Sequence, residues 1–371
     1  MKNTIVKMMT LLLCLSVLLA PVQAAQGSIG RLVSETSAGL SALDGKPGTL
    51  LGKGDEFPAG TSVCDWTAMA LALTGSPEDY DSYLRDLEAH VQSCYAKDGG
   101  LDRVKSTTYH RIALVMLALG GDPECFGQEI DLIADGTYAF AGDSVGAQGL
   151  NGWIYALLAL DASGAEVPEN AKFTRENMVS AIITAQEPDG GFGLMAGKSD
   201  VDITAMALQA LAPYQGDYPD VIEAGLAYLS GAMNDSCRFD AYGESAESSA
   251  QVILALCALG IDPEGDSRFC RGSQTLLTGL EVFRQEDGTY GHTKEDTQGN
   301  YLATAQTLLA LKAVQKLRAG EGWIFDFSDY EGPQQKAPQH DFVYAAIAAA
   351  AVLIICIVIA GKRKKYGKNN R

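Results

Sequence analysis

The sequence is short of basic residues and of the side chains that bind metal ions. It holds 28 Lys and Arg against 46 Asp and Glu, and only four His. Eight basic residues and one acid fall in the end segments 1–25 and 341–371, so residues 26–340 keep 20 basic and 45 acidic residues, and 20 − 45 gives a net charge of −25. A surface of this sign repels phosphate backbones, which argues against nucleic acid as a partner.

Cysteine patterns typical of metal centres are also missing. No CxxC pair and no Cys/His cluster with zinc spacing occurs, so the sequence predicts no metal site and identifies no cofactor. Residues 26–340 contain the cysteines Cys64, Cys94, Cys125, Cys237, Cys257 and Cys270. Cys257 lies in an apolar run and is typical of a small core residue. Disulfide pairing among the others stays open, because a core of this size does not need it.

Uncharged apolar runs lie near both ends of the chain. Residues 1–25 start with two lysines, continue with an apolar run and end in small residues, which is the layout of a secretory signal peptide. Residues 342–360 are 19 residues without a charge, and at about 1.5 Å per residue such a helix nearly crosses a bilayer core of about 30 Å. The basic tail 361–371 should stay in the cytoplasm. We therefore expect a single-pass cell-membrane protein with residues 26–322 outside the cell and a linker at 323–341.

Stretches rich in Ala and Leu recur six times within residues 26–322. Aligned on one position, they give Ala68, Ala113, Ile154, Ala205, Ala250 and Ala305, with steps of 45, 41, 51, 45 and 55 residues. Amphipathic stretches with charges on one face lie between them, at residues 83–96, 170–186, 220–233 and 272–286. Each repeat is therefore predicted to be an outer helix, a glycine turn and an inner helix. Six such pairs can close into a double ring, and a linear stack is the alternative.

Glycine-rich turns precede two of the inner stretches. Residues 186–193 (QEPDGGFG) match residues 285–291 (QEDGTYG), and residues 97–101 (KDGGL) are a weaker copy. The acid ends the outer helix, the glycines take backbone angles that other residues resist, and the aromatic side chain fills the gap between repeats. A structural role is therefore predicted for Asp189, Gly190, Gly191, Phe192, Gly193, Asp287, Gly288, Tyr290 and Gly291.

Polar residues recur at the start of the inner stretches, which a closed ring would gather at one mouth. Three positions before the aligned residues lie Asp65, His110, Asn151, Asp202, Glu247 and Leu302, with Trp66, Tyr109 and Trp153 beside them. Capping of free backbone N–H groups explains the acids and the Asn without a ligand. A polar ring over an apolar cavity is, however, the usual form of a small-molecule site. The ligand-binding candidates are Asp65, Trp66, Tyr109, His110, Asn151, Trp153, Asp202 and Glu247.

Helix pairs joined by Q-x-x-D-G-G-(F/W)-G turns resemble the prenyltransferase and squalene oxidase repeats of the terpenoid cyclase and protein prenyltransferase superfamily. The resemblance spans about residues 62–315 and implies an all-α fold, the α6/α6 toroid of six helix pairs. Residues 200–205 (DVDITA) are similar to the D-x-D-D-T-A motif of squalene-hopene-type cyclases, whose middle aspartate protonates an alkene. Asp200 and Asp202 match the first two acids, while Ile203 stands in place of the third.

The missing third acid argues against cyclase chemistry, because protonating an alkene needs a strong acid in a dry pocket. Prenyltransferase chemistry needs zinc held by Asp, Cys and His, and the D-x-C sequence at residues 235–237 follows an outer helix. Related toroids in cobalamin-carrying proteins bind without catalysis. We therefore expect a membrane-anchored, outward-facing toroid that binds a small molecule or glycan and is not an enzyme. A membrane or surface protein is a further candidate partner.

The alternative is an enzyme, in one of two forms. A terpenoid-cyclase-like enzyme would use Asp202 as its acid with Asp200 as supporter, and a carbohydrate-active α6/α6 barrel would pair Asp202 or Asp65 with Glu247. A scaffold whose cavity is filled by its own side chains is the third possibility. The catalytic candidates of the alternative are therefore Asp202, Asp200 and Glu247.

Overall fold

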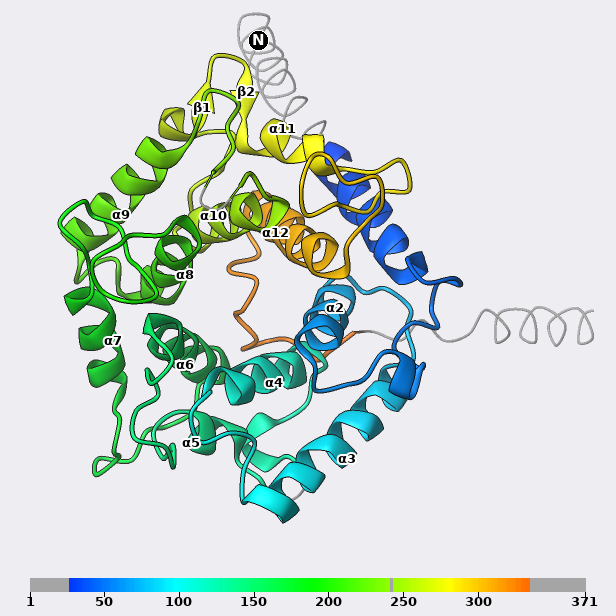
Figure 1. Cartoon of the computed structure of the whole chain (residues 1–371), viewed down its shortest axis with the longest axis vertical. Helices are drawn as coiled ribbons and strands as arrows, with labels where there is room; N and C mark the ends of the chain where they lie inside the picture. Colours follow the sequence, from blue (N-terminus) through cyan, green and yellow to red (C-terminus); the bar gives the residue numbers. More distant parts are fainter. Residues whose placement is uncertain (1–26, 128, 241–242, 334–371) are drawn as a thin grey trace, which may run out of the picture. The chain divides into compact units, whose positions relative to one another are not determined.

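The computed structural model describes residues 27–127, 129–240 and 243–333 (Figure 1). The chain divides into the units Met1–Pro333 and Gln334–Arg371, and all described residues belong to the first. The predicted signal peptide, the membrane helix at 342–360 and the basic tail lie outside the described residues and stay predictions. Among the helices that the structure describes, none combines the length and the apolar character needed to cross a bilayer.

Six inner helices, rich in Ala and Leu, form a closed cycle of contacts in the described part of the chain. Each packs against the next, and the last packs against the first (Figure 1). They are α2 (Ser62–Leu73), α4 (Thr107–Ala118), α6 (Leu150–Ser163), α8 (Val201–Leu211), α10 (Ala246–Ala258) and α12 (Tyr301–Ala319). We call this cycle the inner ring. The six aligned repeat positions fall one in each of these helices and are all fully buried, because small side chains there let neighbouring helices pack closely.

A second set of helices lies outside the inner ring (Figure 1). It comprises a helix at residues 27–42, α3 (Tyr80–Asp98), α5 (Leu132–Gly136), α7 (Arg175–Thr184), α9 (Pro219–Ala232) and α11 (Leu276–Leu280). On α3 the buried side chains Tyr83, Leu87 and Val91 recur every four residues, which gives the helix one apolar stripe toward the ring. The prediction of an all-α fold is confirmed.

The short elements are the ones that the sequence pattern missed or misplaced. The stretch 272–286, predicted as one outer helix, contains only five residues of α helix, because a hairpin of β1 (Cys270–Arg271) and β2 (Gln274–Thr275) precedes α11 and a 3-10 turn follows it. The helix α5 is too short to show a helical period. The 3-10 turns are η1 (Gly54–Glu56), η2 (Pro123–Cys125), η3 (Ala212–Tyr214), η4 (Ser267–Phe269) and η5 (Glu281–Phe283).

The two best-matched glycine turns are built alike. Gly190 and Gly288 have φ angles of 86° and 87°, a left-handed conformation that favours glycine. The backbone N–H groups of the buried aromatics Phe192 and Tyr290 donate to the hydroxyls of Thr204 at 2.8 Å and of Thr304 at 2.9 Å. Each turn is thereby fastened to the first turn of the inner helix that follows it, which fixes where the helix α8 begins.

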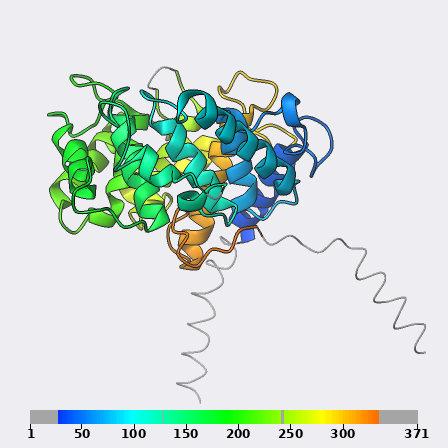
Figure 2. The ribbon, with the colours of Figure 1, turned by 90° about the horizontal axis from the view of Figure 1, so that it is seen from below.

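Residues 321–333, which we call the strap, cross the end of the inner ring where the helices terminate (Figure 2). Tyr330 donates a hydrogen bond to the carbonyl of Ala72 at the end of α2, at 3.2 Å. The aromatic side chains of Trp323, Phe325, Phe327 and Tyr330 touch in sequence, with ring centroids 5.3 to 6.4 Å apart. The predicted linker at 323–341 therefore begins with residues that pack against the core: Phe325 and Phe327 are buried there, and Trp323 and Tyr330 are partly buried.

Candidate functional site

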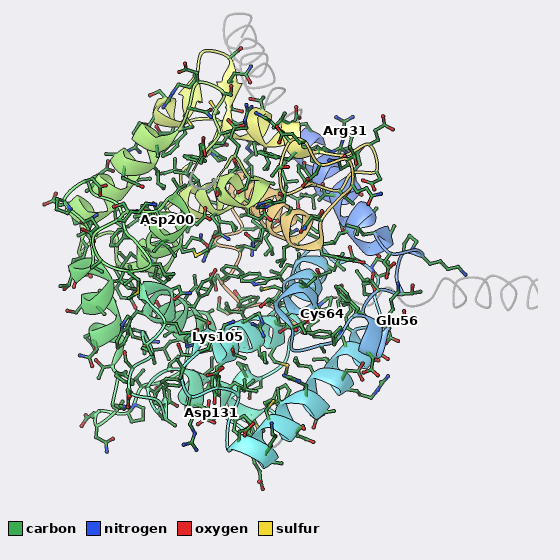
Figure 3. All side chains as sticks on the ribbon, in the orientation of Figure 1. Arg31, Glu56, Cys64, Lys105, Asp131 and Asp200 are labelled. Atoms are coloured by element: carbon green, nitrogen blue, oxygen red, sulfur yellow. The ribbon has the colours of Figure 1, made fainter. Side chains whose placement is uncertain are left out.

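The acid candidates lie at the starts of two neighbouring inner helices. Asp200 is the N-cap of α8, and its Oδ1 accepts hydrogen bonds from the N–H groups of Asp202 at 2.9 Å and Ile203 at 3.0 Å (Figure 3). Ser245 caps α10 in the same way. Asp202 and Glu247 are the second residues of these helices and cap neither. Capping therefore accounts for Asp200 and leaves the carboxylates of Asp202 and Glu247 to other partners.

Asp202 holds a largely buried carboxyl group that is only partly satisfied. The side chain of Ser248 on α10 interacts with this group and acts to lower its pKa. Its Oδ1 atom is buried and has no hydrogen-bond partner among the described residues. Burial raises the pKa of Asp202; the Ser248 hydrogen bond opposes the shift, and the charges of Asp200 and Glu247 add to it. A buried carboxyl with a raised pKa and an unpartnered oxygen is suited to hold a proton and pass it to a bound molecule.

Aromatic side chains reach the same region from inside the ring. Burial raises the pKa of Tyr155 on α6, and the charge of Asp202 raises it further. Trp66 of α2 meets the Tyr155 ring edge-on, with centroids 6.3 Å apart. Since α4 lies between α2 and α6 in the cycle, this contact spans the interior of the ring. Trp66 and Tyr155 thus meet inside the ring, and the charge of Asp202 acts on Tyr155.

Glu247 forms an ion pair or hydrogen bond with an imidazole on the outer side of Asp202. His292 Nδ1 lies 2.9 Å from Glu247 Oε2, and the side chains are 57% and 18% exposed. The carbonyl of His292 also accepts the N–H of Ala246 at 3.0 Å, which fixes the turn beside α10. We call Asp202, Ser248, Glu247 and His292 the Asp202 cluster.

The floor of the ring lies about two turns below the acid. Tyr155, Leu158 and Ala162 follow Asn151 along one face of α6. Met206 and Gln209 of α8 and Pro213 of η3 follow Asp202 at the same sequence spacing. The lower residues of both series line a cavity of about 300 Å³ together with Trp323 and Phe325 of the strap. From Asp202 to Gln209 the helix rises about 10 Å at about 1.5 Å per residue. The cavity therefore has aromatic side chains of the strap in its lining, and Asp202 lies about 10 Å from it along α8.

Asp65 lies apart from the Asp202 cluster and is fully paired. It accepts hydrogen bonds at 2.8 Å from Arg111 Nε, from the Tyr83 hydroxyl and from the N–H of Gly60. Its side chain is completely buried. These bonds use the carboxylate to join α2, α3 and α4, which is a structural role rather than a ligand contact.

Three other predicted ligand residues point into the layer outside the inner ring. His110 Nε2 lies 2.6 Å from the Gly136 carbonyl of α5, and burial lowers the pKa of this histidine to about 4. The Tyr109 hydroxyl accepts the N–H of Leu101 at 2.7 Å. Trp153 packs edge-on against Phe173, with centroids 5.4 Å apart. Of the eight candidates, Asp202 and Glu247 lie at the starts of neighbouring inner helices and interact electrostatically, while Trp66 contacts Tyr155.

Asn151 occupies on α6 the place that Asp202 has on α8, the second residue of the helix. Its Oδ1 is buried without a partner among the residues described. No group of three or more His, Cys, Asp or Glu side chains in this part of the chain is arranged to hold a metal ion. Tyr155, Ser248 and His292 were missed as site residues. Tyr155 lies one helical turn after Asn151, so helical periodicity could have identified it. Ser248 directly follows Glu247, so its place beside a candidate residue was the available signal.

Comparison with known proteins points to an enzyme. No family model matches the chain. The chain is similar to drimenyl diphosphate synthase of Streptomyces showdoensis, with 25% identity over 262 residues that cover 67% of this chain and 48% of that protein. The chain thus spans about half the length of this curated relative. The distant similarity to a synthase supports the relationship to terpenoid cyclases that the repeats and the DVDITA segment suggested.

The expectation of a non-catalytic ligand-binding domain was therefore wrong. It rested on the absent third acid at Ile203, which was taken to leave Asp202 unsupported. The structure gives Asp202 a partly buried position with a buried Oδ1 atom, an interaction with Ser248 of the neighbouring helix, and the charges of Asp200 and Glu247. A relative that is a synthase and a carboxyl in this environment both favour the enzyme alternative.

Proposed function

We propose that the chain is a terpenoid-cyclase-like enzyme with the α6/α6 toroid fold, in which Asp202 is the general acid. The observation that carries the proposal is the buried Asp202 carboxyl, whose Oδ1 lacks a partner among the described residues and whose pKa burial raises. The closed cycle of inner helices and the similarity to drimenyl diphosphate synthase support the fold and the enzyme class.

The proposed reaction begins with proton transfer from Asp202 to one carbon of an alkene. The π electrons form the new C–H bond, the other alkene carbon becomes a cation, and Asp202 becomes a carboxylate. The positive end of the α8 dipole stabilises that carboxylate. The π faces of Trp66 and Tyr155 stabilise the cation at close range, and a second alkene of the same molecule can then attack it to close a ring. Loss of a proton from a neighbouring carbon completes the reaction.

Support for the acid comes, in this proposal, from the neighbouring helix instead of from residue 203. Ile203 is an apolar, 9% exposed side chain and cannot donate a hydrogen bond. Ser248 stabilises the carboxylate form with its hydrogen bond, which makes Asp202 a stronger acid than burial alone would leave it. Glu247 and His292, at the solvent side, offer a route for a new proton after each reaction.

An elongated isoprenoid is the substrate class that this proposal implies. Its alkene end would meet Asp202, and its apolar chain would extend about 10 Å toward the strap. The name of the relative suggests a prenyl diphosphate. The chain has more acidic than basic residues, and negative charge repels a diphosphate. An uncharged polyene is therefore the second candidate substrate. For the carbohydrate-active alternative, the supporting observation is that the charge of Glu247 acts on Asp202. The comparison with known proteins does not support it.

The test is conversion of an isoprenoid panel by the full chain. The panel contains prenyl diphosphates of two to four isoprene units and uncharged polyenes, and products are identified by mass spectrometry as isomers with altered retention. We expect one class to be converted, and Asp202→Asn to lose at least about 100-fold of the rate. The exposed Asp217→Asn is the matched control and should keep full activity. Equal rates for wild type and Asp202→Asn, or a folded wild type that converts nothing, would refute the proposal.

A further inference from the structure

A second cavity lies across the ring from the Asp202 cluster. It has a volume of about 480 Å³ and lies between the helix at residues 27–42, the end of α2 and the second half of α12. Its polar lining includes Ser37, Ser41, Thr74, Ser76, Lys312 and Gln315. Neither the predicted site residues nor the proposed reaction uses any of them.

Lys312 is a half-buried cation without an acidic partner. Its ammonium group donates a hydrogen bond to Gln315 Oε1 at 3.0 Å, and no carboxylate of the described residues forms an ion pair with it. Burial lowers the pKa of Lys312, while the charge of Glu321 at longer range opposes that shift. Residues 26–340 contain 45 acids, so an unpaired and partly desolvated lysine is unexpected in this protein. A buried charge of this kind is stabilised when a ligand of opposite sign occupies the cavity.

The other polar groups of the cavity include three hydroxyls that bond to one another, of which that of Thr74 also donates to the carbonyls of Ala70 and Leu71. The hydroxyl of Ser37 lies 3.2 Å from that of Thr74 and also bonds to that of Ser76, so three hydroxyls form one cluster. Hydroxyl groups can turn their hydrogens toward an acceptor without moving any heavy atom. An ammonium group combined with hydroxyls is a donor set that recognises oxyanions, phosphate above all.

Glu78 restricts the anion to one side of the cavity. Its carboxylate accepts hydrogen bonds from the Ser41 hydroxyl and from the N–H of Leu51, the latter at 3.2 Å. Ser41 is therefore already committed to a negative group. The side formed by Lys312, Ser37 and Ser76 has no such acid in its lining.

We propose that this cavity binds a phosphate group, with Lys312 as the charged contact and the hydroxyls of Ser37 and Ser76 as neutral donors. A volume of about 480 Å³ exceeds what a single phosphate fills, so the ligand is a phosphorylated organic molecule. The site is separate from the proposed reaction, because its walls belong to α2, α12 and the helix at 27–42.

The test uses the full chain and three probes: inorganic diphosphate, glycerol 3-phosphate, and neutral vesicles with and without phosphatidic acid. Calorimetry measures binding of the soluble probes, and flotation measures binding to vesicles. We expect Lys312→Gln to weaken binding at least about tenfold and Lys312→Arg to keep most of it. Lys316→Gln, one turn further along α12, is the matched control and should bind like wild type. Soluble probes and vesicles together distinguish a free phosphorylated molecule from a lipid headgroup.

Thermal unfolding shows whether a loss of binding in Lys312→Gln comes from a folding defect. Without a probe, Lys312→Gln should be at least as stable as wild type, because a desolvated charge has been removed. With a soluble phosphate probe, the melting temperature of wild type should rise while that of Lys312→Gln stays constant. The proposal is overturned if wild type binds no phosphate probe, or if Lys312→Gln binds as tightly as Lys316→Gln. Either result would leave the Asp202 reaction untouched.

Discussion

Asp65 and Asp202 occupy the same position of the repeat, but their carboxyl groups have different partners in the folded protein. Both lie three residues before the aligned alanine of an inner helix, and burial acts to raise the pKa of both. Asp65 receives three donors, among them the guanidinium of Arg111 at 2.8 Å. Asp202 receives a hydroxyl and keeps one buried oxygen without a partner among the described residues. The repeat supplies a buried acid, and its neighbours decide whether that acid is structural or available for chemistry.

The deciding neighbour also has a fixed place in the repeat. Arg111 lies two residues before Ala113 of α4, and Ser248 lies two residues before Ala250 of α10. Each belongs to the inner helix that follows the one bearing the acid; Arg111 bonds to Asp65, and Ser248 acts to lower the pKa of Asp202. The position two residues before the aligned alanine is therefore a cation, Arg111, in the helix next to Asp65, and a hydroxyl residue, Ser248, in the helix next to Asp202.

The largest effect is expected from breaking the paired acid. Asp65→Ala would leave the buried guanidinium of Arg111 without its carboxylate, which should lower the free energy of unfolding by about 3–5 kcal/mol. Chemical denaturation measures the change. Asp202→Asn is the comparison and should cost far less, because Asp202 has no cationic partner of this kind. Equal losses in the two variants would contradict the difference drawn here.

A smaller effect is expected from removing the hydroxyl beside Asp202. Ser248→Ala takes away the hydrogen bond that opposes the raised pKa of Asp202, so the acid becomes weaker. We expect the turnover rate to fall about tenfold, equivalent to about 1.4 kcal/mol. Ser249→Ala, its buried neighbour, should keep the rate of the parent. An unchanged rate in Ser248→Ala would show that α10 does not tune the acid.

Removing the cap of α8 separates helix stability from chemistry. Asp200→Ala should lower the free energy of unfolding by about 1 kcal/mol, through the loss of two hydrogen bonds at the helix start. Asn300→Ala removes the matching cap of α12, whose bonds are 2.9 and 3.1 Å long, and should cost a similar amount. Only Asp200→Ala should also change the pH profile of turnover, because the charge of Asp200 acts on Asp202.

The smallest expected effect is on the pH dependence of stability. The pKa of Asp202 in the folded protein is raised above its usual value of 3.8. Between these two pKa values the folded chain binds more protons than the unfolded chain, so stability falls as pH rises through that window. Asp202→Asn removes this contribution, and its free energy of unfolding should fall less steeply than that of wild type. A parallel pair of curves would mean that the Asp202 pKa is not raised.

The sequence predicted the features that repeat and missed those that do not. The period of Ala and Leu identified the inner helices, and the glycine turns identified their starts. The five residues of α5 carry no period, and the strap was taken for a linker because its aromatic residues lie outside the repeat. Asp202 was chosen through the DVDITA segment, yet its environment depends on Ser248, which is distant in the chain and close only after folding.

Capping was assigned to the wrong acid for a related reason. Asp200 and Asp202 both lie at a helix start, and composition does not tell which of them precedes the first helical residue. The glycine turn is fastened to Thr204 through the N–H of Phe192, and this sets the first helical residue at Val201. Asp200 then takes the cap, and Asp202 is left inside the first turn.

The most direct test of Asp202 as an acid is to run the reaction of an accepted isoprenoid in D₂O. Protonation of an alkene by an exchangeable carboxyl should place one deuterium from solvent on carbon in the cyclised product, and Asp202→Asn should form none of this product. A product without deuterium, or one formed equally well by Asp202→Asn, would contradict the assignment of Asp202 as the acid.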